Sequence, residues 1–334
     1  MKYSQAMPFL FFVLIFSGCR PEIEKIQFAG EAQGTYYAVT YYDQQGRYLQ
    51  DEIDSILVQF DQTASMWVPG SIISRINRGE DNVELNKWFT ELFEVSRQIG
   101  EESNGAFDMT IGPLVNAWGF GFTDRQKLDD LKVDSLKALV DYMKVDLSDG
   151  KVTMGIPGMQ FDFNGIAQGY SVDVLCSYLE SKGITAYLVD IGGEVYASGR
   201  KPDGSKWRVG IEKPAETALS QREIEVVVPL EDKAMATSGS YRKFYEEDGI
   251  RYSHTIDPYT GYPVTHSLLS VTVIAETCTL ADSYATAFMV MGLERSMEFL
   301  TTRDDLEAFF ISSTGTEEYE ISYTKGMDRL LEEK

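Results

Sequence analysis

Two spacings of apolar residues recur along the chain, and together they predict a mixture of strands and helices. Alternating runs rich in Val, Ile, Thr and Tyr predict strands, whereas apolar residues at helical spacing predict helices. The predicted strands cover 34–42, 187–191, 207–211, 224–228, 234–238, 241–245, 268–275, 308–311 and 319–323, and a further strand ends over 161–163. The predicted helices cover 49–60, 88–99, 165–179, 280–291 and 293–300.

The order of these elements predicts one α+β unit of mixed sheets and helices. A run of strands between 195 and 254 indicates a strand-rich insertion, a polar loop is expected over 61–70, and a structured loop with short helical pieces over 105–121. The unit is not a Rossmann fold, because the fingerprint Gly-x-Gly-x-x-Gly is missing, as is a complete P-loop. With 334 residues, 43% of them hydrophobic, the chain is long enough for a large single domain.

The N-terminus has the pattern of a secretion signal followed by a lipid-attachment site. Lys2 precedes an apolar run over 8–16 that is too short to span a bilayer, and Ser17-Gly18 stands directly before Cys19. This segment resembles the lipobox of bacterial lipoproteins, which implies lipidation of Cys19. The alternative is an ordinary signal peptide whose cysteine is accidental. We expect a signal peptide over 1–18, a lipid-anchor tether over 19–30 and the folded domain over 31–334.

Charge and cysteine content narrow the function further. The net charge of −22 repels phosphate backbones, so we expect no nucleic-acid partner. An anionic ligand would need a metal ion or backbone N–H groups to offset the same field. Cys176 and Cys278 permit a disulfide in an oxidising compartment, although two buried free thiols are the favoured reading. No Cys/His cluster in the sequence indicates zinc.

Five short stretches combine Gly, Asp, Thr and His in ways that packing alone does not require. In one of them, 162–169, a glycine turn leads into a helix whose free N–H groups suit a phosphate. An ordinary join between strand and helix, capped by Asp162, is the alternative. The five stretches are 105–114, 162–169, 236–239, 254–261 and 281–287.

The last two stretches carry the side chains best suited to catalysis. Asp282 and Thr286 are four residues apart, which on a helix places a carboxylate and a hydroxyl on one face. Both are hard oxygen ligands that suit Mg²⁺, although a helix cap and a packed threonine would explain the same pair. His254 precedes a turn over 257–261 and suits a base or a phosphate contact, or else it is a structural histidine tied to Asp257.

Taken in this order, the stretches resemble the ApbE family, the FAD:protein FMN transferases. The resemblance rests on Gly-Ala-Phe-Asp at 105–108, His-x-x-Asp-Pro-x-Thr-Gly at 254–261 and Ala-Asp-x-x-Ala-Thr-Ala at 281–287, and it begins at Gln33. It implies an ApbE-like flavin transferase domain that uses Mg²⁺ to move FMN from FAD to a Thr or Ser hydroxyl of an exported redox flavoprotein subunit, releasing AMP. It also implies a lipid-anchored protein on the extracytoplasmic side of the cell membrane.

The resemblance further implies which residues form the site. His254 would be catalytic, and Mg²⁺ would be held by Asp282, Thr286, the carbonyl of Ala285 and a backbone oxygen of Gly165 or Ala167. Gln33, Trp67 and Gln168 depart from the common family pattern, which has Met, Tyr, and Lys or Glu there. Contacts to FAD are implied for Gln33, Trp67, Ala106, Phe107, Asp108, Asp162, Gln168 and Ile256.

Two other functions use the same features. An FAD pyrophosphatase would use the same site with water as the acceptor. A periplasmic flavin-binding lipoprotein would hold FAD without reacting with it. The products distinguish the three functions, since they are FMN on a protein, free FMN with AMP, and unchanged FAD.

Overall fold

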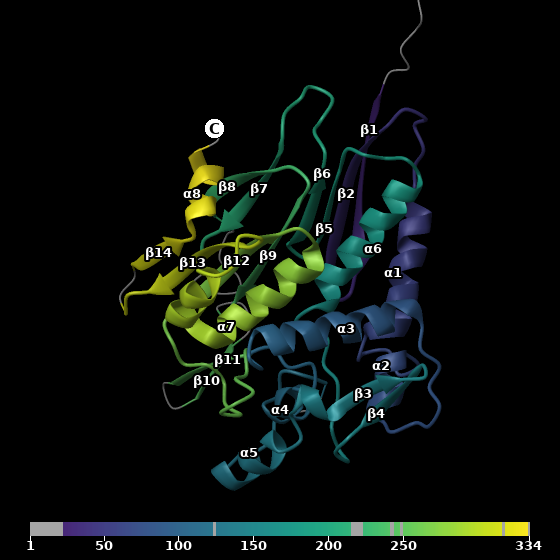
Figure 1. Cartoon of the computed structure of the whole chain (residues 1–334). Helices are drawn as coiled ribbons and strands as arrows, with labels where there is room; N and C mark the ends of the chain where they lie inside the picture. Colours follow the sequence, from purple (N-terminus) through teal and green to yellow (C-terminus); the bar gives the residue numbers. More distant parts are fainter. Residues whose placement is uncertain are drawn as a thin grey trace, which may run out of the picture.

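An antiparallel sheet of eight strands runs through the molecule and supports the site (Figure 1). The structure is a computed structural model that describes residues 23–332 apart from 123–124, 215–222, 241–243, 248–249 and 316–317. Every neighbouring pair in the sheet is antiparallel, which differs from the parallel sheet of a Rossmann fold. The strands in order across the sheet are β1 (Glu24–Ala32), β2 (Thr35–Asp43), β5 (Tyr187–Ile191), β6 (Glu194–Ser198), β9 (Lys233–Gly239), β12 (Leu268–Ala275), β13 (Glu307–Ser313) and β14 (Tyr319–Tyr323).

Both faces of this sheet are covered, which explains the nearly continuous apolar runs in β12 and β13. Side chains alternate between the faces along a strand. Phe310 therefore packs against Phe288 of one helical layer, whereas its neighbour Phe309 packs in a second core with Met327. The first layer is α6 (Ala167–Ser181) and α7 (Cys278–Leu300), and the second is β7 (Trp207–Glu212), β8 (Ile224–Leu230) and α8 (Lys325–Glu332).

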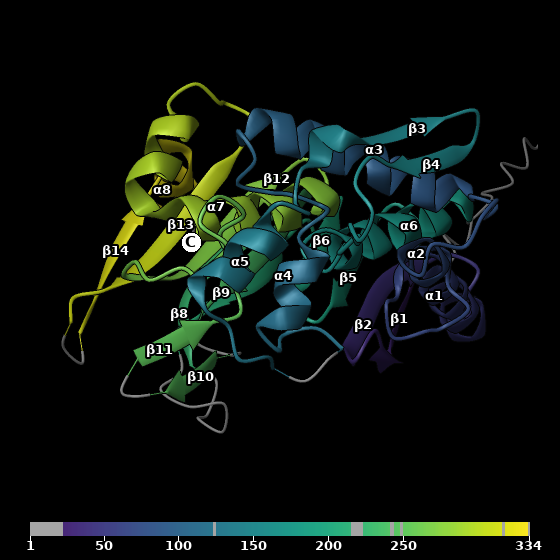
Figure 2. The same cartoon turned by 90° about the horizontal axis from the view of Figure 1, so that it is seen from below.

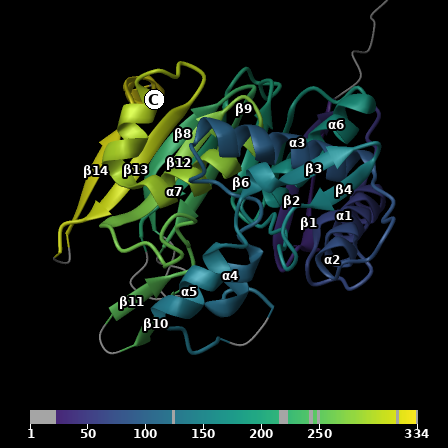
Figure 3. The same ribbon diagram turned by 60° about the horizontal axis from the view of Figure 1, so that its bottom comes forward.

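The remaining helices and strands lie outside these layers. Figures 2 and 3 show α4 (Gly112–Ala117) and α5 (Asp130–Lys137) beside the hairpin of β10 (Phe244–Glu247) and β11 (Ile250–Ser253). A buried cluster of Leu114, Trp118, Val133 and Ile256 joins the two helices to the segment after the hairpin. The outer elements are α1 (Gln50–Ala64), α2 (Ile72–Asn77), α3 (Lys87–Glu102), α4 (Gly112–Ala117), α5 (Asp130–Lys137), the 3-10 helix η1 (Tyr142–Lys144), β3 (Val145–Ser148), β4 (Lys151–Met154), β10 (Phe244–Glu247) and β11 (Ile250–Ser253).

The α+β architecture agrees with the sequence prediction, and three local predictions are wrong. No strand ends over 161–163, where the chain forms only a single bridge between Gln160 and Ile111. The tether predicted over 19–30 is too long, because β1 begins at Glu24. Within the strand-rich insertion, β6 and β9 belong to the central sheet, and only β7, β8, β10 and β11 lie outside it. The strand predicted over 241–245 falls partly outside the described residues.

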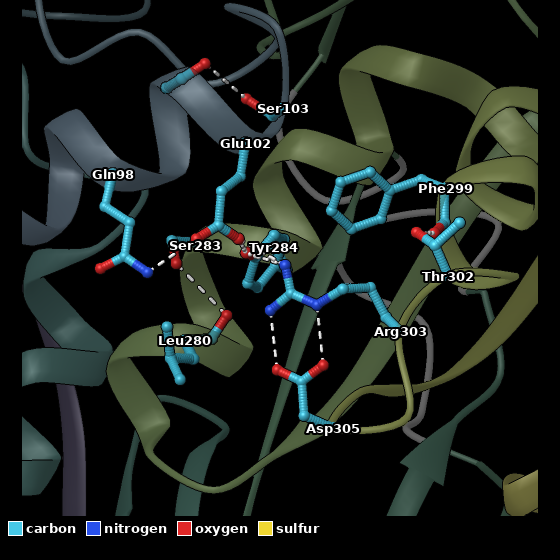
Figure 4. A network of polar contacts seen from close by, with 11 residues as sticks. Gln98, Glu102, Ser103, Leu280, Ser283, Tyr284, Phe299, Thr302, Arg303 and Asp305 are labelled. Atoms are coloured by element: carbon cyan, nitrogen blue, oxygen red, sulfur yellow. Dashed lines mark hydrogen bonds and ion pairs between the residues drawn. The ribbon is translucent and has the colours of Figure 1, made fainter.

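A polar network fixes α7 against α3 (Figure 4). The Arg303 guanidinium donates to Glu102 of α3, to the Tyr284 hydroxyl at 2.9 Å, and twice to Asp305 at 2.7 Å. The Tyr284 hydroxyl donates to Glu102. Burial and the Glu102 carboxylate both raise the pKa of Tyr284, so this hydroxyl keeps its proton. The network therefore fixes the position of α7 relative to α3.

Arg303→Met tests the contribution of this network to stability. Hydrogen bonds to charged, half-buried partners stabilise a fold more than exposed ion pairs do, so we expect a loss of about 1–3 kcal/mol in the free energy of unfolding. Urea denaturation at neutral pH measures it. Arg75→Met is the matched control, because Arg75 pairs with Glu80 in an exposed ion pair that contributes about 1 kcal/mol or less. Equal losses in the two variants would contradict the assignment.

Candidate active site

A cleft of about 400 Å³ opens where the turn between β1 and β2 meets the end of α1 and the start of α6. Four of the predicted site residues, Gln33, Trp67, Ala167 and Gln168, line it. They come from three separate parts of the chain, so the fold itself brings them together. The remaining lining residues are Gly34, Phe60, Asp61, Ala64, Ser65, Val68 and Asn164.

Gln33 presents an unused hydrogen-bond donor in this cleft. Its backbone has φ of +53°, a left-handed conformation that few non-glycine residues adopt. Its Oε1 accepts from the Ser171 hydroxyl at 3.3 Å, while its Nε2 is buried without a hydrogen-bond partner among the described residues. Because buried donors are almost always paired in native proteins, this Nε2 indicates a ligand acceptor in the cleft.

Trp67 contributes an apolar wall that faces solvent. Its side chain is 62% exposed, which is unusual for a tryptophan, and its ring meets Phe122 edge-on at 6.5 Å between centroids. An exposed aromatic face beside a cleft suits stacking against a planar ring system. The cleft thus combines a stacking surface with a free amide donor.

Asp282 lies on α7 and is bound by the first turn of α6. Its Oδ2 accepts from the Gly169 N–H at 2.9 Å, and the side chain is buried. A Cβ at position 169 would stand 2.4 Å from the Cys278 carbonyl oxygen, so only glycine permits this approach of the two helices. Asp282 is therefore placed by α6, and Ala167 and Gln168 in the same turn line the cleft.

A second contact between the same helices runs in the opposite direction. Asp173 on α6 accepts from the backbone N–H groups of Cys278 and Thr279, at 2.9 and 2.8 Å, and from the Thr279 hydroxyl at 2.5 Å. It therefore caps the start of α7. Burial raises the pKa of Asp282 to about 7, with Asp173 adding to the rise and the Gly169 N–H opposing it. A buried carboxylate held in this way favours a cation.

Thr286 lies one turn further along α7, against the glycine turn that precedes α6. A Cβ at Gly165 would stand 2.9 Å from Thr286 Cγ2 and 3.0 Å from its Oγ1, so the backbone of Gly165 fits directly against this side chain. Ser238 of β9 lies 3.5 Å from the same hydroxyl, oxygen to oxygen. Ala285 is fully buried beside it. The three elements bring together one carboxylate, two hydroxyls and a glycine backbone.

This donor set fits Mg²⁺ better than it fits a soft metal. Hard oxygen ligands from a carboxylate, hydroxyls and a backbone carbonyl are those that Mg²⁺ takes when substrate phosphates complete its shell. Among the described residues, no group of three or more His, Cys, Asp or Glu side chains is positioned to hold a metal by itself. Asp282, Thr286 and the Gly165 turn are thus suited to a metal that arrives with its substrate.

The predicted residues of 105–114 and 162–169 are largely engaged in the fold. Both oxygens of Asp108 accept hydrogen bonds, from Thr110 and from the Tyr142 N–H. Asp162 accepts from the Asn164 N–H at 2.8 Å and so shapes the glycine turn. Ala106 and Phe107 are buried. Asp162 thus positions the turn, and the contacts of all these residues to FAD stay a prediction.

His254 and Ile256 follow β11. His254 is half-buried, and its ring meets Phe120 edge-on at 6.3 Å between centroids. The Ile256 side chain packs in the apolar cluster with Leu114 and Trp118, so any ligand contact there falls to its backbone. Trp118 also donates to the Gly261 carbonyl at 2.8 Å, which fixes the turn after His254.

Sequence reasoning missed the parts played by Ser238 and Asp173. Ser238 stands in the stretch 236–239, which attracted attention for its hydroxyls without a defined role. Asp173 carried no signal, because one polar residue inside a helix pattern is ordinary. Cys176 and Cys278 are free and buried, which is the favoured of the two sequence readings. Burial raises the pKa of both thiols, so neither is a reactive nucleophile.

Comparisons with known proteins show the family of this chain. The profile of the ApbE family matches residues 33–310. An FAD:protein FMN transferase from Vibrio cholerae serotype O1 is 38% identical over 294 residues, which cover 85% of this chain and 87% of that protein. The chain belongs to the ApbE family.

Solved structures of the ApbE family share the fold. The flavin transferase ApbE from Vibrio cholerae matches with a TM-score of 0.82 at 33% identity, covering 93% of this chain and all of that one. The apo form of the flavinyl transferase ApbE from Pseudomonas stutzeri matches with a TM-score of 0.82 at 33% identity, covering 92% and 97% of the two chains. The ApbE-like α+β fold expected from the sequence is thereby confirmed.

Asp282→Asn tests whether the buried charge of Asp282 in this ApbE-family site destabilises the fold. Because its folded pKa of about 7 lies above the ordinary value of 3.8, the carboxyl destabilises the metal-free fold progressively as the pH rises from about 4 to about 7, fully above that range, and hardly at all below about pH 4, where it is protonated in both the folded and the unfolded state. The amide keeps an acceptor for Gly169 without the charge. We expect the variant to be more stable than the parent by roughly 1–3 kcal/mol at pH 8 in EDTA, and by little at about pH 4.

Chemical denaturation at the two pH values measures this difference. Asp51→Asn, at an exposed position in the first turn of α1, is the control and should change stability only slightly. An equal gain for Asp282→Asn at both pH values would contradict the buried-charge explanation.

Proposed function

We propose that this protein is a Mg²⁺-dependent FAD:protein FMN transferase that attaches FMN to a Thr or Ser hydroxyl of another exported protein and releases AMP. Membership of the ApbE family supports the proposal. In this chain, the main structural support for the proposal is the segment 165–169, where the glycine turn leads into α6. One short turn supplies Ala167 and Gln168 to the cleft wall and presents Gly165 and Gly169 to the oxygens of α7.

The cleft suits the flavin end of FAD, and the α7 site suits its diphosphate. Trp67 offers a stacking face for a planar ring, and Gln33 Nε2 offers a donor for a ring carbonyl. The side-chain amide of Gln168 lies against the turn at Gly192. A Cβ on residue 192 would stand 2.4 Å from Gln168 Nε2. Since the protein is strongly acidic, the diphosphate needs a counter-charge next to Asp282 and Thr286.

Asp282, Thr286 and a backbone oxygen of Gly165 or Ala167 would hold the metal, with the Ala285 carbonyl as a further ligand. Mg²⁺ bound there would neutralise phosphate charge and thereby favour displacement at phosphorus. Ser238 adds a hydroxyl beside Thr286 and orients it. The chain itself contributes a fixed, water-excluded frame, because Asp282 and Ala285 are buried.

The reaction is a phosphoryl transfer. The acceptor hydroxyl oxygen forms a bond to the FMN phosphorus, the bond from that phosphorus to the AMP phosphate breaks, and AMP leaves with both electrons of the broken bond. His254 takes the hydroxyl proton or orients the hydroxyl, since an imidazole is neutral and basic near neutral pH. The acceptor is proposed to be an exported redox subunit that presents its Thr or Ser on a flexible segment.

We also propose that the protein is lipid-anchored through Cys19 on the extracytoplasmic side of the membrane. The support is the Ser17-Gly18-Cys19 sequence after a short apolar run. Cys19 and the signal sequence lie outside the described residues. Within the part of the chain that the structure describes, no helix is long and apolar enough to cross a membrane.

A product assay tests the proposed reaction. The protein is incubated with FAD, Mg²⁺ and a soluble flavoprotein subunit, and we expect protein-bound flavin fluorescence with one AMP released for each flavin attached. EDTA or Asp282→Ala should abolish both. Free FMN without labelled acceptor would instead indicate a pyrophosphatase, and unchanged FAD a binding protein.

His254→Ala, in the same assay, should keep FAD binding and lower the transfer rate by roughly 10²–10⁴-fold, as the loss of a general base does. His266→Ala is the matched control, because His266 is the other histidine of the chain and hydrogen-bonds the Met289 carbonyl at 2.7 Å. A His254 variant with parental rate would show that this histidine is structural.

Cys19→Ser tests the anchor in cells. Without the thiol no lipid is attached, and the chain should move from the membrane pellet to the soluble fraction after cell disruption. Membrane sedimentation of the variant, equal to that of the parent, would contradict lipidation.

A further inference from the structure

A second cleft of about 410 Å³ lies at the opposite end of the molecule from the candidate active site. It is formed by the start of β1, the loop after β2, the loop after α6 and the loop after β6. Its charged lining residues are Arg47, Lys182 and Arg200 with a single carboxylate, Asp43. The other lining residues are Ile23, Tyr42, Gln44, Gln45, Gly183, Thr185, Ala186 and Pro202.

The charge of this cleft is opposite to that of the rest of the protein. The chain carries a net charge of −22, and three other clefts among the described residues each have more carboxylates than cations in their linings. Arg47 pairs with Asp43, and Arg200 with Glu231, while the Lys182 ammonium lies over the Tyr178 ring. Glu24, whose carboxylate lies beside Gly46, also belongs to this end. The three cations and the three carboxylates Asp43, Glu231 and Glu24 therefore balance, so an anionic surface repels this end less than it repels the acidic protein as a whole.

Three elements run between the two clefts and set their separation. β1, α1 and α6 each have one end at the second cleft, near Ile23, Arg47 and Lys182, and the other at the active-site cleft, near Gln33, Ala64 and Ala167. A nine-residue strand spans roughly 30 Å and a 15-residue helix about 22 Å. In Figure 1 the start of β1 accordingly lies at the end of the molecule opposite α4 and α5.

The chain leaves little distance between this end and the proposed lipid anchor. Cys19 precedes Ile23 by four residues, which span at most about 14 Å in any conformation. Ile23 and Tyr48 are 42% and 62% exposed at the same end, so it also offers apolar contacts to an interface. An anchored molecule therefore keeps the start of β1 within reach of the lipid headgroups.

We propose that this end of the molecule, the anchor face formed by Ile23, the loop 44–48, Lys182, Thr185 and Arg200, rests on anionic phospholipid headgroups. The proposal rests on the lipidation proposed for Cys19. The anchor keeps the protein at the membrane, and the charge distribution then selects the orientation, because this end is balanced in charge while the protein as a whole carries −22. This orientation holds the active-site cleft roughly 22–30 Å above the headgroups, so the acceptor hydroxyl must be presented at that height.

Energy transfer from single fluorophores to headgroup-labelled lipid tests the orientation. Cys176 and Cys278 are buried, so maleimide reacts selectively with a cysteine introduced by Gln44→Cys on the anchor face or by Leu131→Cys on α5. The full-length lipidated protein is placed in phosphatidylcholine vesicles with or without roughly 30% phosphatidylglycerol. We expect transfer from position 44 to exceed that from position 131, to rise with the anionic lipid and to fall back in about 0.5 M NaCl.

Charge reversal supplies the matched comparison. Lys182→Glu combined with Arg200→Glu should abolish the rise in energy transfer from position 44 that anionic lipid causes. Lys182→Glu alone should reduce that rise, and it breaks no ion pair of the described structure. Lys132→Glu with Lys137→Glu on α5 makes the same change in net charge and should leave the increase intact. Transfer of flavin to a soluble acceptor in detergent, unchanged in all variants, shows that they fold.

The possible failures are distinguishable. If Cys19 is not lipidated, the parent protein does not sediment with vesicles at all. If the transferase reaction is wrong, the detergent assay fails in the parent as well. The proposed orientation would be contradicted if, in anchored protein, energy transfer from position 44 did not depend on lipid charge or stayed below that from position 131.

Discussion

The reciprocal capping of α6 and α7 is the interaction on which the site depends. Gly169 at the start of α6 donates to Asp282 on α7, and Asp173 on α6 accepts from Cys278 and Thr279 at the start of α7. Each helix thereby satisfies free N–H groups of the other. The contact requires glycine at 169, and it fixes Asp282 and Thr286 against the turn that forms the cleft wall. Displacing either helix would separate Asp282 and Thr286, the proposed metal ligands, from the cleft.

This arrangement explains how an acidic protein can bind an acidic substrate. The net charge of −22 opposes FAD, and the one buried carboxylate at the centre of the site adds to that field rather than offsetting it. Burial makes Asp282 costly as an anion, which its raised pKa expresses. A divalent cation removes this cost and supplies the counter-charge that a diphosphate needs. Metal and substrate are therefore expected to depend on each other for binding.

Sequence patterns predicted the long periodic elements better than they predicted how those elements pack around the candidate site. Strands such as β5 and helices such as α3 have complete periodic patterns, so their position follows from local sequence. β1 was missed because its inward residues Ile26 and Phe28 lie within the segment 19–30 that was interpreted as the lipid-anchor tether. The approach of Ser238 to Thr286 depends on the packing of β9 against α7, which no local spacing encodes. Asp108 shows the converse, since a residue recognisable from its motif has its carboxylate occupied by the loop.

The two ends of the molecule have opposite requirements, and the same elements connect them. At one end the turn before α6 has to expose backbone and amide groups to a ligand, which leaves Gln33 Nε2 unpaired and Trp67 exposed. At the other end the Arg47 guanidinium ties the loop after β2 to the Lys182 carbonyl after α6, at 2.9 Å. β1, α1 and α6 span the distance between these ends as rigid elements. The hydrogen-bonded end at Arg47 and Lys182, the base of the molecule, therefore supports a site that has a strained backbone and an unpaired donor at Gln33. In an anchored molecule, the orientation proposed for this base would set where the site meets its acceptor.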